Sequence, residues 1–218
     1  MKRFIIICEG QTEQSFCNEV LKPYFSSLEI FLETPTIKKT HGGIVRWSAL
    51  KYQIEQHLLE DKTAYLTTLI DYYGLHAYHG FPRWKEAEKT MDRIEKVNII
   101  ENGMANDIRE NLRRRFVPYI QLHEFEGILF SDLSVFDTNF ETNEFIDYEY
   151  LKATIRDYPN PELINDGKET APSKRLKRQI KGYNKQVYGA LLALETGLDT
   201  IRKKCPRFNN WISQIEMI

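Results

Sequence analysis

Acidic residues follow predicted strands at several points along the chain. Glu9 comes directly after the apolar residues 4–8, and Glu13 lies in the first turn of the helix predicted next. Asp71 ends a second β-prone run, residues 64–70. Parallel strands that are joined by helical crossovers end at the same edge of their sheet. The sequence therefore predicts that these three carboxylates meet at one edge.

Two further acids follow the fourth predicted strand, residues 116–122. Glu124 and Glu126 share a face if that strand continues through them. Crowded carboxylates resist joint ionisation, and a divalent cation removes this cost. Oxygen ligands without a Cys/His set favour Mg²⁺ or Mn²⁺ over Zn²⁺. The predicted metal ligands are Glu9, Glu13, Asp71, Glu124 and Glu126.

Simpler interpretations of the first two acids stay open. A carboxylate at a strand end, such as Glu9, can simply be solvated. An acid in the first turn of a helix, such as Glu13, complements the helix dipole whatever its function.

A basic segment lies in the last third of the chain. Residues 170–194 contain no acid, and their basic residues are Lys174, Arg175, Lys177, Arg178, Lys181 and Lys185. Pro172 suits the first turn of a helix, where cations oppose the dipole. We expect Lys174 and Arg175 to bind a phosphate there; the alternative is a solvated basic helix face.

The remaining pattern predicts an α/β protein with a mainly parallel sheet of about four strands flanked by helices. Residues 30–38 form the other predicted strand, and residues 45–59, 84–101 and 104–115 are predicted helices, with Gly103 separating the last two. Gly197 and Pro206 separate helices at the C-terminal end. We expect an α/β domain over residues 1–137 and a helical region over residues 138–218 packed on it.

Composition limits the possible partners and location. The 218 residues carry a formal net charge of −1, so a site for a polyanion must be a local patch. No stretch is long enough to span a membrane, and residues 1–9 lack the features of a signal peptide. The three cysteines lack metal-site spacing and are expected to be reduced thiols in a cytoplasmic protein.

Several segments together resemble the Toprim fold, the metal-binding domain of topoisomerases, primases and several nucleases. Residues 9–13, Glu-Gly-Gln-Thr-Glu, are similar to a turn of the overcoming-lysogenization-defect nucleases, in which both glutamates belong to a two-metal site. The chain resembles most a family of bacterial Toprim-like domains of unknown function that includes the nuclease subunit of the PARIS anti-phage system. The segments that carry this resemblance are residues 9–13, 71–74, 123–126, 170–175 and 205–211.

The resemblance implies a Mg²⁺-dependent nuclease that acts in phage defence, with Glu9, Asp71 and Lys174 as catalytic residues. Its substrate would be DNA or RNA, including tRNA, and an ATPase partner could restrain it. The wider Toprim pattern has a second aspartate where this chain has Tyr73. The alternative is therefore a catalytically degenerate domain that binds nucleic acid, a nucleotide or a protein. Oligomeric state is left open.

Overall fold

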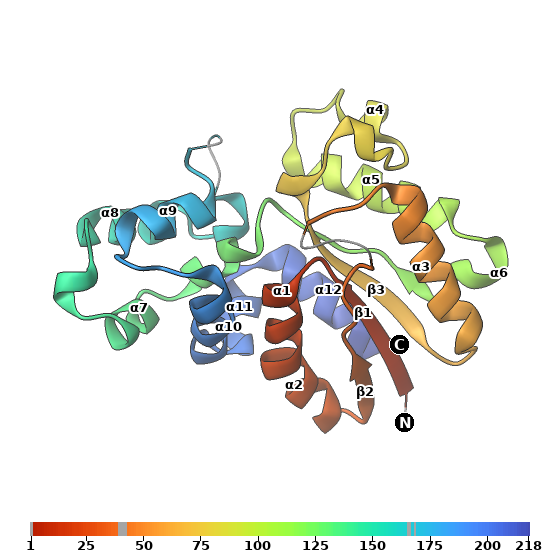
Figure 1. Ribbon diagram of the computed structural model, residues 1–218, viewed down its shortest axis with the longest axis horizontal. Coiled ribbons are helices and arrows are strands. Elements are labelled where there is room, and N and C mark those ends of the chain that lie inside the picture. Colours follow the sequence, from red (N-terminus) through yellow and green to blue (C-terminus); the bar gives the residue numbers. More distant parts are fainter. Residues whose placement is uncertain (1, 39–42, 165–166, 168) are drawn as a thin grey trace.

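A five-stranded parallel sheet forms the centre of the molecule (Figure 1). The computed structural model describes residues 2–38, 43–164, 167 and 169–218. The strands are β1 (Lys2–Cys8), β2 (Ile30–Glu33), β3 (Tyr65–Asp71), β4 (Phe116–Val117) and β5 (Ile120–Gln121). Their order is β2-β1-β3-β4, and β5 also pairs with β3. The predicted α/β class with a mainly parallel sheet is confirmed.

The pairing of β1 with β3 brings their C-terminal ends to one edge of the sheet. Cys8 lies opposite Leu69, and the backbone N–H of Glu9 donates to the Leu69 carbonyl at 2.9 Å. Asp71 lies opposite Gln121 at the end of the β3–β5 pair. The chain therefore leaves the sheet at Glu9 and at Asp71 on the same edge.

The fourth predicted strand is interrupted. Residues 118–119 separate β4 from β5, because Pro118 has no N–H to donate to a ladder. The side chain of Thr68 bonds to the interrupted backbone instead. Its Oγ1 donates to the Tyr119 carbonyl at 2.8 Å and accepts from the Tyr119 N–H at 3.2 Å. The prediction of one continuous strand over residues 116–122 was therefore wrong.

Alternate residues of β1 face two separate cores. Phe4 and Ile6 face the first core, with α1 (Gln11–Phe16), a π-helical segment (Cys17–Leu21) and α2 (Lys22–Ser27). Ile5 and Ile7 face the second core, which α3 (Trp47–Glu60) and α5 (Arg93–Asp107) cover. Figure 1 shows these two pairs of helices on opposite sides of the strands. Burial on both faces explains the continuous apolar run of β1.

Gly103 lies inside a helix, where the sequence predicted a break. The helices of this region are α4 (Trp84–Ala87), α5 and α6 (Glu110–Arg113), and α5 continues through Gly103. A Cβ on Gly103 would lie 2.9 Å from the carbonyl oxygen of Pro82. The glycine therefore serves close packing of α5 against the loop before α4.

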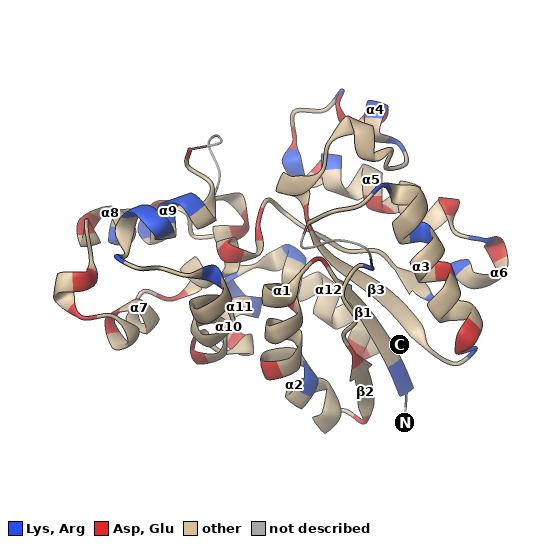
Figure 2. Ribbon diagram, viewed as in Figure 1, with Lys and Arg blue, Asp and Glu red and all other residues tan. Residues whose placement is uncertain are grey.

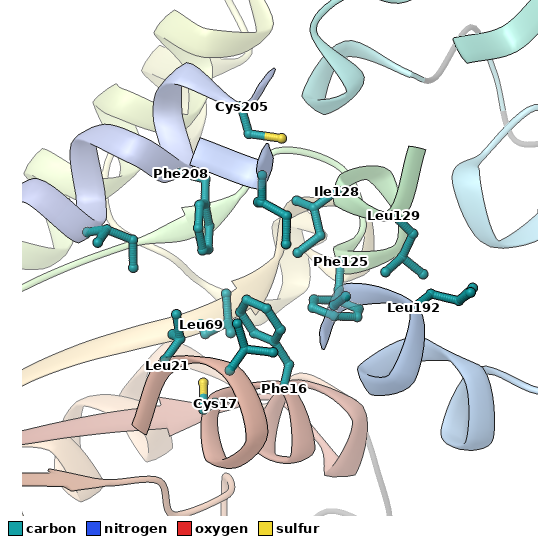
Figure 3. Close-up of a cluster of buried hydrophobic side chains, with 14 of the residues drawn as sticks. Phe16, Cys17, Leu21, Leu69, Phe125, Ile128, Leu129, Leu192, Cys205 and Phe208 are labelled. Atoms are coloured by element: carbon teal, nitrogen blue, oxygen red, sulfur yellow. The ribbon is translucent and has the colours of Figure 1, made fainter. Parts of the chain in front are cut away.

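Helices from residue 134 onwards complete the first core. They are α7 (Ser134–Asn139), α8 (Tyr148–Asp157), α9 (Pro172–Gln179), α10 (Lys185–Thr196), α11 (Leu198–Lys204) and α12 (Pro206–Met217). Gly197 and Pro206 separate the last three, as predicted. Figure 3 shows Phe16 of α1 near Phe208 of α12, with Phe125 between Phe16 and Leu192 of α10. The region that begins at residue 138 thus packs on the sheet through a shared core.

Among the described residues, no helix combines the length and the apolar character that crossing a membrane requires.

Candidate carboxylate site at the edge of the sheet

Glu9 and Asp71 are joined by a hydrogen bond across the ends of β1 and β3. The backbone N–H of Asp71 donates to Oε2 of Glu9 at 2.9 Å. The Asp71 side chain in turn accepts a hydrogen bond at Oδ1 from the Phe125 N–H at 2.9 Å. These backbone donors fix the direction of both carboxylates. The predicted proximity of Glu9 and Asp71 is therefore present in the structure.

Glu13 returns from the first turn of α1 towards the same edge. Its Oε2 accepts a hydrogen bond from the Gly10 N–H at 2.9 Å, and the residue is 3% exposed. A Cβ on Gly10 would lie 3.3 Å from this same oxygen, so the glycine gives the carboxylate room. Glu13 thus supports the start of α1, as the simpler interpretation held, and also joins the acidic cluster.

Glu124 and Glu126 turn towards different partners. The strand ends at Gln121, and Glu124 directly precedes a 3-10 helix, Phe125–Ser131. Glu124 accepts hydrogen bonds from the N–H and the hydroxyl of Ser173 in α9, at 2.9 and 3.0 Å. Glu126 is fully buried and faces α10. Neither Glu124 nor Glu126 lies in a strand, so the expectation that a continuing strand would place their side chains on one face does not apply.

Lys185, the first residue of α10, places an ammonium group among these acids. Its Nζ lies 3.4 Å from Oε1 of Glu13 and 3.2 Å from Oε2 of Glu126. In the sequence Lys185 belongs to the basic segment, and no local pattern connects it to the carboxylates. The available signal was weak: a lysine directly after Asn184, whose side chain caps the helix by accepting from the Gln186 N–H.

Burial and mutual repulsion raise the pKa values of the acids in this cluster. Burial, with added repulsion from Glu13 and Glu126, raises the pKa of Glu9 to about 7, although the bond from the Asp71 N–H opposes the change. Burial also raises the pKa of Asp71 well above its usual range, while Lys185 lowers it. The pKa of Glu126 is raised by burial and by Glu124, against the attraction of Lys185. Carboxylates of this kind gain most from a nearby cation.

Lys185 itself is held in its charged form. Burial by itself would lower the pKa of the ammonium group. The carboxylates of Asp71, Glu126 and Glu13 outweigh burial and raise this pKa. The charged lysine is therefore part of the electrostatic balance of the cluster.

A cavity of about 1020 Å³ opens beside the cluster. Its walls come from the loop after β1, from the start of α1 and from the segment that joins α9 to α10. Glu9 and Glu13 line one part, while Tyr183, Lys185 and the exposed Lys177 line another. The basic ribbon of α9 lies close to this segment in Figure 2. The cavity thus combines acids at the sheet edge with lysines from the C-terminal third.

The two residues predicted to bind phosphate occupy different environments in α9. Lys174 is exposed, and Lys177 follows three residues later on the same helix face. Arg175 is 6% exposed; its guanidinium donates to the Thr170 carbonyl and the Tyr150 hydroxyl and lies over the rings of Tyr150 and Tyr158. Arg175 therefore holds α9 against α8.

The chemistry of the carboxylate cluster suits a hard divalent cation, but the side chains are not gathered around one position. In the described part of the chain, no group of three or more His, Cys, Asp or Glu side chains is placed to hold a metal ion. Two buried atoms that face this region, Oε1 of Glu126 and the hydroxyl of Tyr183, have no hydrogen-bond partner among the described residues. The carboxylate oxygens are thus ligands of the type that Mg²⁺ or Mn²⁺ prefers, but Glu13 and Glu126 are already paired with Lys185.

Comparison with known proteins identifies the family but no function. A search of curated proteins and a search of solved structures each gave no match. The family model "Domain of unknown function (DUF4276)" matches residues 8–216. This match includes every predicted site residue. The chain therefore belongs to the DUF4276 family of domains of unknown function.

Proposed function

We propose that the protein is a Mg²⁺- or Mn²⁺-dependent nuclease of the Toprim type that hydrolyses a phosphodiester of a nucleic acid. The observation that carries this proposal is the clustering of Glu9, Glu13, Asp71 and Glu126 at one edge of the sheet, where Glu9 and Glu13 line the cavity and burial raises the pKa of Glu9 to about 7. Carboxylates with strongly perturbed pKa values beside a cavity are candidates for a functional site.

Different residues of the cluster would bind the two metal ions. Glu9 and Asp71, with Glu124, would hold one ion, and Glu13 with Glu126 would help to hold a second. When bound, the ions would activate a water and stabilise the negative charge that develops on the phosphate oxygens. The backbone donors to Glu9 and Asp71 would keep both carboxylates in fixed directions during the reaction.

Basic side chains of α9 would bind the substrate phosphate. Lys177 lines the cavity, and Lys174 extends the same face of the helix. The water oxygen would form a bond to phosphorus as the bond to the leaving oxygen breaks, which gives a phosphomonoester and a hydroxyl. Lys174 and Lys177 would offset charge on the phosphate during this exchange.

The biological role is proposed from the sequence resemblance. The nuclease would act as an effector of phage defence inside the cell, restrained by an ATPase partner until infection. DNA, tRNA and other RNA are all substrates to be tested.

The experiment measures cleavage of labelled single-stranded DNA, duplex DNA, RNA and tRNA with Mg²⁺, with Mn²⁺ and with chelator. We expect cleavage by the wild type that requires the metal and falls at least about a hundredfold in Glu9→Gln and Asp71→Asn. Glu149→Gln is the control, since Glu149 is an exposed residue of α8. Calorimetry with Mn²⁺ accompanies the assay. A wild type that neither binds the metal nor cleaves any substrate would overturn the proposal.

A second candidate function follows from two features of the site. Tyr73 replaces the second aspartate of the Toprim pattern, and Lys185 already pairs with Glu13 and Glu126. These features favour a domain that binds nucleic acid without cutting it. Oligonucleotide binding that is unchanged by chelator, with no cleavage, would select this function.

A further inference from the structure

The ammonium group of Lys185 lies where the predicted ligands of a second ion converge. It contacts one oxygen each of Glu13 and Glu126, which reach it from α1 and from the 3-10 helix after β5. Glu126 is fully buried and Glu13 nearly so. Leaving two buried carboxylates without a cation is costly, so Lys185 meets a need that a metal ion would otherwise meet.

The backbone that carries Lys185 is anchored, whereas its side chain has access to the cavity. The side chain of Asn184 caps α10 through the Gln186 N–H at 2.9 Å, and the Asn184 carbonyl accepts from the Tyr188 N–H at 2.9 Å. The Lys185 side chain lines the cavity and is 34% exposed. A change of side-chain rotamer would therefore take the ammonium group away from the acids without moving the helix.

We propose that Lys185 is an internal counter-ion, which neutralises the carboxylate cluster in the metal-free protein and is displaced when a divalent cation binds. This inference rests on the metal site of the proposed function. Glu13 and Glu126 cannot give the same oxygens to an ammonium group and to a metal ion. A positive charge a few ångströms from a bound divalent cation would also repel it.

The need to displace Lys185 lowers the affinity of the site for a metal ion. Every binding event must break the two ion pairs of Lys185, so the affinity for metal is lower than the carboxylates alone would give. This competition raises the metal concentration at which the site is half filled. Lys185 thus sets the concentration range over which metal occupies the site.

The test compares Mn²⁺ binding by calorimetry in the wild type, Lys185→Met and Lys152→Met. Lys152 is the control, because it is an exposed lysine of α8 that does not line the cavity. We expect Lys185→Met to bind Mn²⁺ about tenfold more tightly or better, since a charge at this distance changes binding by that order. Lys152→Met should bind within about threefold of the wild type.

Thermal unfolding supplies an independent readout. Without metal, Lys185→Met should unfold at a lower temperature than the wild type, because two buried carboxylates lose their cation. Added Mn²⁺ should raise the unfolding temperature of this variant more than that of the wild type. Should Lys185→Met fail to fold, Lys185→Gln is measured in its place, because the amide can still donate to Glu126 without carrying charge.

The outcomes separate this inference from the proposed function. If the wild type binds Mn²⁺ and Lys185→Met binds it equally or more weakly, the counter-ion role is overturned and the metal site stands. If only Lys185→Met binds Mn²⁺, the inference is supported in its strongest form. If neither protein binds the metal, the proposed metal site fails, and the inference fails with it.

Discussion

The backbone N–H of Asp71 donates a hydrogen bond to Oε2 of Glu9 at 2.9 Å, so one acid of the site orients the other. The bond crosses from the end of β3 to the end of β1. It uses the peptide group of Asp71 and leaves that residue's own carboxylate free to accept from Phe125. The relative position of the two acids is therefore set by strand register rather than by side-chain packing.

The raised pKa of Glu9 makes stability depend on pH. With a pKa of about 7 in the folded protein and about 4.5 in the unfolded chain, the folded state binds the proton more tightly. The contribution of Glu9 to the free energy of unfolding therefore falls as pH rises from 4.5 to 7, and the loss persists above 7. Glu9→Gln, which never ionises, should be more stable than the wild type at pH 8 by about 1–3 kcal/mol.

Chemical denaturation in excess chelator, at pH 4 and at pH 8, measures this difference. The extra stability of Glu9→Gln should vanish at pH 4, where Glu9 of the wild type is protonated in both the folded and the unfolded state. Glu149→Gln should match the wild type at both values. A Glu9→Gln variant that is less stable than the wild type at pH 8 would show that the buried carboxylate is stabilising.

Replacing Glu124 with glutamine separates its structural role from its predicted role as a ligand. The glutamine oxygen can still accept from the Ser173 N–H, and its NH2 group can donate to the Ser173 hydroxyl, so the free energy of unfolding should change by no more than about 1 kcal/mol. Loss of the charge should weaken Mn²⁺ binding about tenfold or more. Calorimetry and denaturation on the same sample test both parts, and unchanged Mn²⁺ affinity would remove Glu124 from the metal site.

The contact between α1 and α10 leaves no room for a side chain at Gly189. A Cβ there would lie 2.7 Å from Cγ2 of Thr12. Gly189→Ala should therefore cost about 1–3 kcal/mol of stability, although alanine is the better helix former. Thr12→Ser removes the opposing methyl, so the double variant should regain most of the loss. Additive losses in the double variant would place the strain elsewhere.

Glu162 fixes the start of α12 to the loop before α9. Its buried carboxylate accepts from the N–H groups of Arg207 at 2.9 Å and Phe208 at 3.0 Å. Glu162→Ala leaves both donors unsatisfied in a buried place and should cost about 2–4 kcal/mol. Thermal denaturation measures the loss against Glu149→Ala, an exposed glutamate whose removal should change little. Equal unfolding temperatures for the two variants would contradict the capping role.

The sheet and its acidic edge were predictable because short-range patterns specify them. The continuous apolar run of β1 and the acid after it indicate a buried parallel strand with a polar end. Gly103 was misinterpreted because a glycine inside a helix and one that ends a helix look alike until Pro82 is seen beside it. Pro118 indicated from the sequence an edge or strand-start position. The hydrogen bonds between Thr68 and Tyr119 that compensate for the interrupted strand could not be predicted.

The position of Lys185 shows the limit of sequence patterns most clearly. Its partners Glu13 and Glu126 come from distant parts of the chain, and only tertiary packing brings the three together. Local spacing places a lysine at a helix start. It carries no information on which sheet edge that helix meets. The buried environment of Arg175 was hidden in the same way, since an arginine beside exposed lysines has the same local pattern whether it faces solvent or the core.

The two sides of the cavity have consequences for synthesis of the protein. Glu9, Glu13 and Asp71 leave the ribosome early, whereas Lys185 and the rest of the α9–α10 segment are made only in the last part of translation. A nascent chain therefore carries the acids without the groups that balance their charge and close the cavity around them. A chain that ends before α10 therefore lacks both the ammonium group that pairs with Glu13 and Glu126 and one wall of the cavity.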